Sequence, residues 1–368
     1  MRLRRLALVS GALTALAGIS VLPAGATNPP AAATTSAPGV CPPGALELGY
    51  SDALDKKVVD GTTVGGLSSI DYDARRHAYA TVVDNDESRP SRLWFIRDLG
   101  DPQVTGTLIL RRPGGTPYNG TDADNEGLTV LPDGRYLVSS ETEPSIRIFG
   151  RDGVQQGSLP VPARFRVAPA GEATENATLE GLSASPSGRY VYAAMEGTLS
   201  GDAPESGAEA VWRRILVFHR EHGQYGLQKQ IGYRVDPGMR ISEISAYDDG
   251  RFAVLEAFFS TDFGNRTRVY AVTDANSAPD VSGIANLSEA PRRDIMRKSL
   301  VVDFTRCPSM GAPAKEHQTN PLMDNYEAMT IRADRIGPFR YGTLAVLSDD
   351  NFGSGQTTRI VRVATLLP

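Results

Sequence analysis

The sequence predicts a single all-β propeller of five blades, closed by a strand from the N-terminal part of the chain. Three observations predict this fold. A strand–turn–strand unit recurs five times, an apolar strand follows each copy, and the chain ends before the last copy gains a fourth strand. Copies at intervals of roughly 55 to 85 residues are typical of repeat architectures, and a propeller of four-stranded blades accommodates them in one domain.

The clearest copy of the unit covers residues 125–141. Leu128 and Val130 alternate with small or polar residues, which is the period-2 pattern of a half-buried strand. Residues 132–134 are Pro-Asp-Gly and favour a tight turn, after which residues 136–138 return as a second strand. Equivalent units begin near Gly66, Glu180, Ser242 and Tyr326.

Further strands complete each predicted blade. Third strands are expected at residues 91–95, 145–149, 213–218, 267–272 and 358–363, and fourth strands at 106–110, 157–161, 230–234 and 299–304. Because the last copy has only three strands, we expect a strand from about residues 45–60 to complete its blade and remove the open edge. A sixth blade between Asp274 and Asn325 is the alternative, although this stretch is rich in Pro, Ser and charge, as insertions are.

The first 40 residues predict export. Residues 1–26 combine three arginines, an apolar run over 6–22 and the small-residue segment 24–26, as in a secretory signal peptide. A membrane anchor is the alternative, but Gly11 and Gly18 interrupt a run that is short for a spanning helix. Residues 27–40 predict a flexible linker rich in Pro, Ala and Thr, followed by one folded domain over residues 41–368. We therefore expect a secreted protein without a membrane span.

Composition and cysteine count narrow the function classes. The chain has 38 Lys and Arg against 43 Asp and Glu, a net charge of −5, which becomes −8 (35 against 43) without the three arginines of residues 1–26. A mildly acidic chain without a basic stripe argues against nucleic-acid binding and is compatible with cation binding. In an exported protein the two cysteines, Cys41 and Cys307, predict one disulfide, with two free buried thiols as the alternative. The four histidines show no metal spacing, which argues against zinc.

Acidic residues recur at two positions of the repeat, at the start of the first strand and at the end of the second. They are Glu126, Glu180, Glu243 and Glu327, and then Asp84, Glu141, Glu196, Glu256 and Asp350. Equivalent positions of a closed ring converge near its axis, and carboxylate and amide oxygens are hard ligands that suit calcium. We predict a calcium site at the axial mouth with the ligands Glu126, Glu180, Glu327, Asp349, Asn125 and Asn325.

Arginine recurs at a third position of the repeat, in the third strand. The five are Arg92, Arg147, Arg214, Arg268 and Arg359. Arg147, Arg268 and Arg359 are predicted to orient a small anionic substrate, because the guanidinium group binds phosphate and carboxylate through two parallel hydrogen bonds. The alternative is structural: a leading glutamate shares the buried face of its strand and needs a partner, so repeated Glu–Arg pairs would join neighbouring blades without any chemistry.

Four motifs are informative in combination. They are Asn125-Glu126-Gly127-Leu128, Leu179-Glu180-Gly181-Leu182, Asn325-Tyr326-Glu327-Ala328-Met329 and Leu347-Ser348-Asp349-Asp350-Asn351-Phe352. Through them the chain resembles the bacterial "esterase-like activity of phytase" family over about residues 60–366. The resemblance implies an exported β-propeller that hydrolyses phosphate or carboxylate esters and is related to calcium-dependent propeller phytases. It assigns no catalytic residue.

The predicted function is that of an exported, metal-dependent ester hydrolase, with phosphate esters favoured and a monomer as the expected state. The alternative is a non-catalytic exported propeller that binds a ligand or a protein partner on one face. A Ser-His-Asp hydrolase is disfavoured, because residues 65–69 (Gly-Gly-Leu-Ser-Ser) lack the Gly-x-Ser-x-Gly pattern of a nucleophile elbow.

Overall fold

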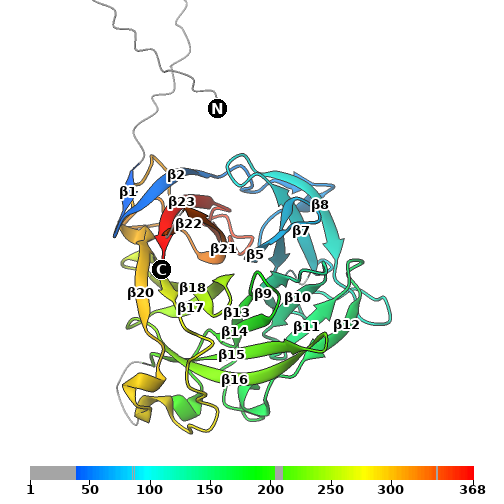
Figure 1. The fold of residues 1–368 in the computed structure, drawn as a ribbon. Coiled ribbons are helices and arrows are strands. Elements are labelled where there is room, and N and C mark those ends of the chain that lie inside the picture. Colours follow the sequence, from blue (N-terminus) through cyan, green and yellow to red (C-terminus); the bar gives the residue numbers. More distant parts are fainter. Residues whose placement is uncertain (1–38, 85, 87, 204–209, 337–338) are drawn as a thin grey trace, which may run out of the picture. The chain divides into compact units, whose positions relative to one another are not determined.

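Five antiparallel sheets surround a central axis as the blades of a propeller (Figure 1). The structure, a computed structural model, describes residues 39–84, 86, 88–203, 210–336 and 339–368. The predicted signal peptide and the predicted linker up to residue 38 lie outside these residues. Within them, no helix has the length and apolar character needed to cross a membrane. The all-β propeller and its five blades are therefore confirmed.

Blades 1 to 4 each contain four strands that follow one another in the chain, with the first strand of each blade nearest the axis. Blade 1 consists of β5 (Leu67–Asp73), β6 (Ala78–Val83), β7 (Arg92–Arg97) and β8 (Gln103–Ile109). Blade 2 consists of β9 (Asn125–Val130), β10 (Tyr136–Ser140), β11 (Ser145–Phe149) and β12 (Gln155–Leu159). Blade 3 consists of β13 (Leu179–Ala184), β14 (Tyr190–Met195), β15 (Trp212–Glu221) and β16 (Gln224–Arg234). Blade 4 consists of β17 (Arg240–Asp248), β18 (Arg251–Ser260), β19 (Gly264–Val272) and β20 (Lys298–Asp303). The predicted third and fourth strands are all present.

Blade 5 closes the ring with strands from both parts of the chain. It consists of β21 (Tyr326–Ile336), β22 (Phe339–Ser348), β23 (Ile360–Leu367), β2 (Ala45–Ser51) and β1 (Val40–Cys41). β2 pairs antiparallel with β23, with Leu46 opposite Ala364, which confirms the predicted closing strand. Only the first part of the predicted segment 45–60 has this role, because β3 (Val58–Val59) pairs with β4 (Thr62–Thr63) in a separate hairpin.

A disulfide fastens the closing strands to the late chain. Cys41 in β1 is bonded to Cys307, which follows the 3₁₀ turn η5 (Phe304–Arg306) and lies 266 residues later in the sequence. Both cysteines are buried in the apolar core between blades 4 and 5. The predicted disulfide is confirmed, and two free thiols are excluded. A disulfide is compatible with an exported protein.

The segment between β19 and β20 is an insertion. Its described elements are two short 3₁₀ turns, η3 (Leu287–Glu289) and η4 (Arg292–Asp294), so the alternative of a sixth blade is wrong. Two further turns of the same length, η1 (Ala163–Phe165) and η2 (Ser200–Asp202), lie in loops of blades 2 and 3. The insertion is held against β16, since the N–H of Met296 donates to the carbonyl of Gly232 at 2.8 Å.

Side chains of the innermost strands connect neighbouring blades around the axis. Thr129 Oγ1 accepts from the N–H of Ala184 at 2.9 Å, and Ser183 Oγ accepts from the N–H of Ala246 at 2.9 Å. Innermost strands of adjacent blades are not paired in one sheet, so side-chain oxygens satisfy backbone donors that would otherwise be buried without partners. The strands approach closely at Gly127, where an added Cβ would lie 2.4 Å from Leu182 Cβ.

Candidate functional site

A β-bulge interrupts the innermost strand of every blade near its start. The pairing with the second strand shifts between Leu67 and Ser69, and equivalent shifts occur in β9, β13, β17 and β21. A bulge inserts one extra residue and turns its side chain away from the regular alternation. The residues at the bulge position, which we name the bulge ring, are Ser68, Glu126, Glu180, Ser242 and Glu327.

A second ring lies beside the first, where the second strand ends in blades 1, 2, 3 and 5 and at the equivalent position inside β18 in blade 4. Ser140 is paired with Asn125 and Ser348 with Tyr326, so Glu141 and Asp349 follow directly after the last paired residue. The residues at this position, which we name the strand-end ring, are Asp84, Glu141, Glu196, Ala257 and Asp349. The carboxylates of both rings form what we call the axial carboxylate cluster.

Blade 4 departs from the pattern in both rings, and the sequence-based alignment was wrong there by one residue. Glu243 does not occupy the bulge position but the next one, which is Gly127 in blade 2. Its carboxylate is buried, accepts from the N–H groups of Leu182 at 3.1 Å and Ile244 at 2.9 Å, and also accepts from Ser69 across the axis. Burial raises the pKa of Glu243 well above its ordinary value.

Two acids predicted for the strand-end position are also displaced by one residue. Glu256 pairs opposite Ile241, so its side chain turns away from the cluster, where it accepts from Tyr233 at 2.6 Å and Lys298 at 2.5 Å. Asp350 accepts from the N–H of Gly66 at 3.0 Å and pairs with Lys56. Because side chains alternate across a strand, an error of one residue moves a side chain to the opposite face.

Blade 4 supplies the cluster with a cation in place of acids. Arg240 lies two residues before Ser242, and its Nη1 donates to Glu180 at 3.2 Å and to Glu196 at 2.9 Å. Its Nη2 donates to Glu327 at 2.7 Å. One guanidinium group therefore connects blades 3, 4 and 5 and faces carboxylates from both rings.

Carboxylates of the cluster lie close enough to raise one another's pKa values. Burial, followed by the charges of Glu180 and Glu327, raises the pKa of Glu126 well above its ordinary value. Burial and then the charge of Glu196 raise the pKa of Glu180, although Arg240 opposes this shift. Burial raises the pKa of Glu141 to about 7, even though its carboxylate accepts from the N–H of Thr178. Like charges in a water-poor site resist ionisation together, so the cluster favours an additional cation or protons.

Two groups of three carboxylates have the spacing of a metal site. In each group one oxygen per residue lies within 4.8 Å of the others; the groups are Asp124, Glu126 and Glu141, and Glu141, Glu180 and Glu196. Glu141 belongs to both. Calcium takes six to eight oxygen ligands, so a donor set of carboxylates without histidine fits this ion in chemical type.

The predicted metal ligands lie in or beside the cluster. The charges of Glu180 and Glu327 both raise the pKa of Glu126. Burial is the largest cause that raises the pKa of Asp349, and the charges of Asp84 and Glu327 raise it further. Asn325 Nδ2 donates to Glu327 at 3.1 Å, while Asn125 Nδ2 donates to the carbonyl of Val83 at 3.3 Å. The four predicted acids are thus brought together, and their role as calcium ligands stays a prediction.

The three arginines predicted to bind substrate each donate hydrogen bonds to a loop residue. Arg359 Nε and Nη2 donate to Asp52 at 2.7 and 2.8 Å. Arg268 donates to Asp236 at 2.8 Å, and Arg147 donates to the carbonyl of Asp122 at 3.3 Å. Among the described residues, the ion pairs of Glu180 and Glu327 are with Arg240 and not with this recurring set. The alternative of repeated Glu–Arg pairs between blades is therefore not seen in that form within the described residues, and substrate binding by Arg147, Arg268 and Arg359 stays a prediction.

A cavity opens beside Arg240, on the side where blade 4 lacks the acids of the other blades. It has a volume of about 570 Å³, and its lining residues include Arg240, Met239, Ala257, Phe258 and Phe259. Ala257 is the blade 4 member of the strand-end ring, so the missing carboxylate leaves an apolar wall. The opening gives a small molecule a route to the guanidinium of Arg240 with apolar contacts on one side.

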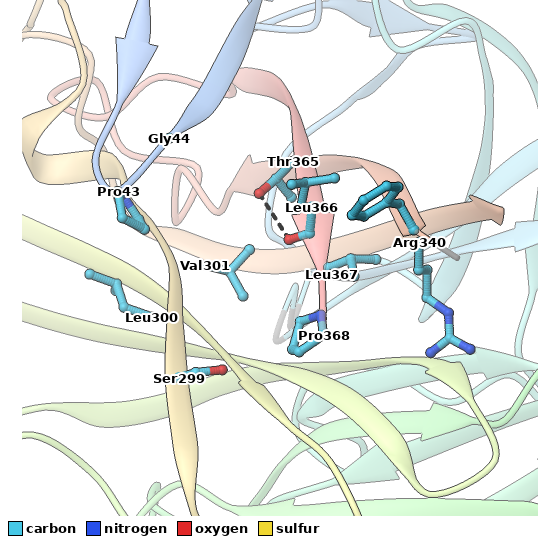
Figure 2. A pocket seen from close by; sticks show the side chains of 11 residues that line it. Pro43, Gly44, Ser299, Leu300, Val301, Arg340, Thr365, Leu366, Leu367 and Pro368 are labelled. Atoms are coloured by element: carbon cyan, nitrogen blue, oxygen red, sulfur yellow. Dashed lines mark hydrogen bonds between the residues drawn. The ribbon is translucent and has the colours of Figure 1, made fainter. Parts of the chain in front are cut away.

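A different cavity, between the outer strands of blades 4 and 5, lies away from these acids. Figure 2 shows Leu300 and Val301 on one side and Leu366, Leu367 and Pro368 on the other. Its volume is about 610 Å³, and Arg340 is the charged side chain in its lining. Arg340 is already paired with Asp248. None of the carboxylates of the axial cluster is among the described residues that line this cavity.

Sequence reasoning missed Arg240 and Asp124 and did not rank Glu141 and Glu196 among the ligands. A signal for Arg240 was present. If the fourth repeat is aligned on the apolar Ile244 in place of Glu243, Arg240 falls at the position of Asp124 and Asn325, two residues before the bulge. A cation at the position that holds Asp124 in blade 2 and Asn325 in blade 5 marks blade 4 as different.

Structural comparison shows distant likeness to several known proteins. The tail fibre of Staphylococcus aureus phage P68 matches over 87% of this chain and 53% of its own, with 11% identity and a TM-score of 0.39, so the chain spans about half of that protein. A protein of unknown function from Bacteroides caccae matches over 76% and 72%, with 9% identity and a TM-score of 0.33. The PQQ-bound aldose sugar dehydrogenase of Streptomyces coelicolor matches over 66% and 94%, with 14% identity and a TM-score of 0.32.

Sequence comparison is more specific. No curated protein matches the chain significantly. The model of the phytase-like family, described as esterase-like activity of phytase, matches residues 62–352 and so includes both rings and Arg240. The chain therefore belongs to the phytase-like family.

Proposed function

We propose that this protein is an exported, calcium-dependent ester hydrolase whose site is the axial carboxylate cluster, with phosphate esters as the favoured substrates. The observation that carries the proposal is the imbalance of charge at one end of the axis. The cluster takes carboxylates from blades 1, 2, 3 and 5, and within the described residues Arg240 is paired with three of them, Glu180, Glu196 and Glu327. Membership of the phytase-like family supports ester hydrolysis as the reaction class.

Calcium is the favoured metal because the donors are oxygens. Glu141 would be shared by the two groups of carboxylates, with Glu126, Asp124, Glu180 and Glu196 completing them. When bound, the ion would supply Lewis-acid chemistry at an ester oxygen or at a water molecule. A divalent cation also removes the repulsion that raises the pKa values of Glu126 and Glu180, which supports binding of metal by the ionised carboxylates.

The residues around the opening support a substrate with an anionic group and an apolar part. Arg240 is the cation that borders both the cluster and the cavity, and it would hold the anionic end. Met239 and Phe258 would pack against the apolar part and exclude water from the ester.

The test combines metal analysis with hydrolysis of three substrates. Calorimetric titration should detect calcium binding, and the calcium-loaded protein should hydrolyse p-nitrophenyl phosphate or phytate faster than p-nitrophenyl acetate. Glu126→Gln and Glu141→Gln should each weaken calcium binding by at least about tenfold, because each removes one charged ligand. Glu221→Gln removes an exposed carboxylate at the end of β15 and should leave calcium binding unchanged.

The competing function is a non-catalytic propeller that binds a ligand or a protein partner. The contact that favours it is the bridge through Arg240, which ties three blades together and would serve stability alone. Calcium binding without hydrolysis of any of the three esters would favour this function. Absence of both calcium binding and hydrolysis would reject the proposed hydrolase.

A further inference from the structure

A strongly basic cavity lies between blades 3 and 4, lined by residues other than those of the axial site. It has a volume of about 770 Å³ and is lined by the charged residues Arg234, Arg292, Arg293, Arg297 and Lys298, together with Trp212. No aspartate or glutamate is among its described lining residues. In a chain with a net charge of −5, this is a local excess of positive charge.

Three of these cations are available to a ligand. Lys298 is already paired with Asp236 at 2.8 Å and with Glu256 at 2.5 Å, so these two carboxylates balance its charge. Within the described ranges, Arg234, Arg292 and Arg297 have no carboxylate within 4.0 Å, and all three are exposed. Arginines that share one cavity repel one another, and an anion with several charges relieves this repulsion.

The backbone that presents these arginines is fixed against blade 3. The N–H of Met296 donates to the carbonyl of Gly232 at 2.8 Å, and Ile295 packs so closely that a Cβ at Gly232 would lie 2.7 Å from its Cδ1. Earlier in the insertion, Leu287 is buried and its N–H donates to Asp202 at 3.0 Å. A fixed backbone lowers the ordering cost of binding, because only side chains must adjust.

An aromatic wall accompanies the arginines. Trp212 is half-buried at the start of β15, and the guanidinium of Arg234 lies over its ring at 5.8 Å. This stacking orients Arg234 at the edge of the cavity while leaving its donors available. The cavity therefore combines three forked donors with one flat apolar surface.

We infer that this cavity binds an oligophosphate, meaning a small molecule with several linked phosphate groups. The guanidinium fork matches a pair of phosphate oxygens, and three such forks need an anion with several charged groups. The volume is within the range of sites for small molecules. The inference does not depend on hydrolysis or calcium binding at the axial cluster, which is formed by other residues.

Inorganic tripolyphosphate is the probe. Calorimetric titration of the exported form should show binding that weakens as salt is added. Because the chain has two tryptophans and Trp94 is buried, quenching of accessible tryptophan fluorescence reports on Trp212. Arg292→Ala combined with Arg297→Ala should weaken binding by at least about 30-fold, since several charge-assisted hydrogen bonds are lost. Both positions are exposed, so the fold should be retained.

The matched control removes the same charge elsewhere. Arg97→Ala combined with Arg306→Ala changes two exposed arginines outside the cavity and should leave the affinity within about twofold. Adenosine triphosphate distinguishes the source of the phosphates: tighter binding than tripolyphosphate indicates that a ring stacks on Trp212, and equal affinity indicates a free oligophosphate. No binding of tripolyphosphate at millimolar concentration, or equal loss in both double variants, would overturn the inference.

Discussion

Arg240 donates to Glu327 of the next blade at 2.7 Å, and through this contact a single side chain of blade 4 joins the acids of blades 3 and 5. The guanidinium stands two residues before a bulge whose counterparts in blades 2, 3 and 5 carry glutamate. Blade 4 therefore supplies a cation to a site whose acids come from the other blades.

Removing the cation should destabilise the metal-free protein. Arg240→Met leaves Glu180, Glu196 and Glu327 without their shared partner and should cost about 3 kcal/mol, near the lower end for a broken buried pair because the arginine side chain is 29% exposed. Chemical unfolding in the presence of a chelator measures the loss. Calcium should restore part of it if the ion binds the same carboxylates. Arg335→Met, which removes an arginine that is 71% exposed, is the control and should change stability by less than about 0.5 kcal/mol.

The stability of the metal-free protein should depend on pH in a defined direction. The pKa of Glu141 is raised to about 7 in the fold, above its ordinary value of 4.5, so the folded state binds this proton more tightly than the unfolded state. Its contribution is fully present below about pH 4.5 and is lost as pH rises to about 7, by up to about 3 kcal/mol. Unfolding free energies measured across this range with a chelator test the slope.

The variant Glu141→Gln provides the comparison for this pH dependence. It cannot ionise, so the fall in stability between about pH 4.5 and 7 should become smaller. Saturating calcium should flatten or reverse the slope in the parent protein, because the metal favours ionised carboxylates. A slope that is the same in parent and variant would show that Glu141 does not titrate as described.

Deleting the closing strand should prevent folding. A chain that begins at Asp52 lacks β1, β2 and Cys41, which exposes the edge of β23 and removes the disulfide to Cys307. Loss of the disulfide alone should cost about 2–4 kcal/mol, and Cys41→Ser combined with Cys307→Ser measures that part. A chain that begins at Gly39 is the control. Cooperative thermal unfolding of the shorter chain at the control temperature would contradict the role of β2.

A side chain at Gly127 should destabilise the fold, because the innermost strands β9 and β13 lie close together there. Gly127→Ala places a Cβ 2.4 Å from Leu182 Cβ and 2.6 Å from the carbonyl oxygen of Glu180, so it should destabilise the fold by about 1–3 kcal/mol. Gly106→Ala in β8 is the matched control, since an added Cβ there meets nothing within 4 Å. Equal unfolding free energies for the two variants would show that blades 2 and 3 separate without cost.

The architecture could be predicted because it depends on local, repeated patterns. Alternation around Leu128, turn residues at 132–134 and an incomplete last copy are properties of short segments, and a ring of such units has few ways to close. The same repetition brought Glu126, Glu180 and Glu327 together, because equivalent positions of a closed ring face one axis. The two cysteines could be paired because they were the only two.

The bulge position in β17 and the partners of the charged side chains depend on tertiary structure and could not be predicted from the repeats. In β17 the bulge falls at Ser242, one residue before Glu243, so Glu243 is a buried acceptor for Ser69 and Arg240 lies among the acids. Arg359 contacts Asp52, more than 300 positions earlier in the chain, so its partner could not be read from a local motif. The sequence by itself determined which residues repeat and which strands they form, because periodicity is local. Which blade differs, and what each charge faces, depended on contacts that exist only after the ring has closed.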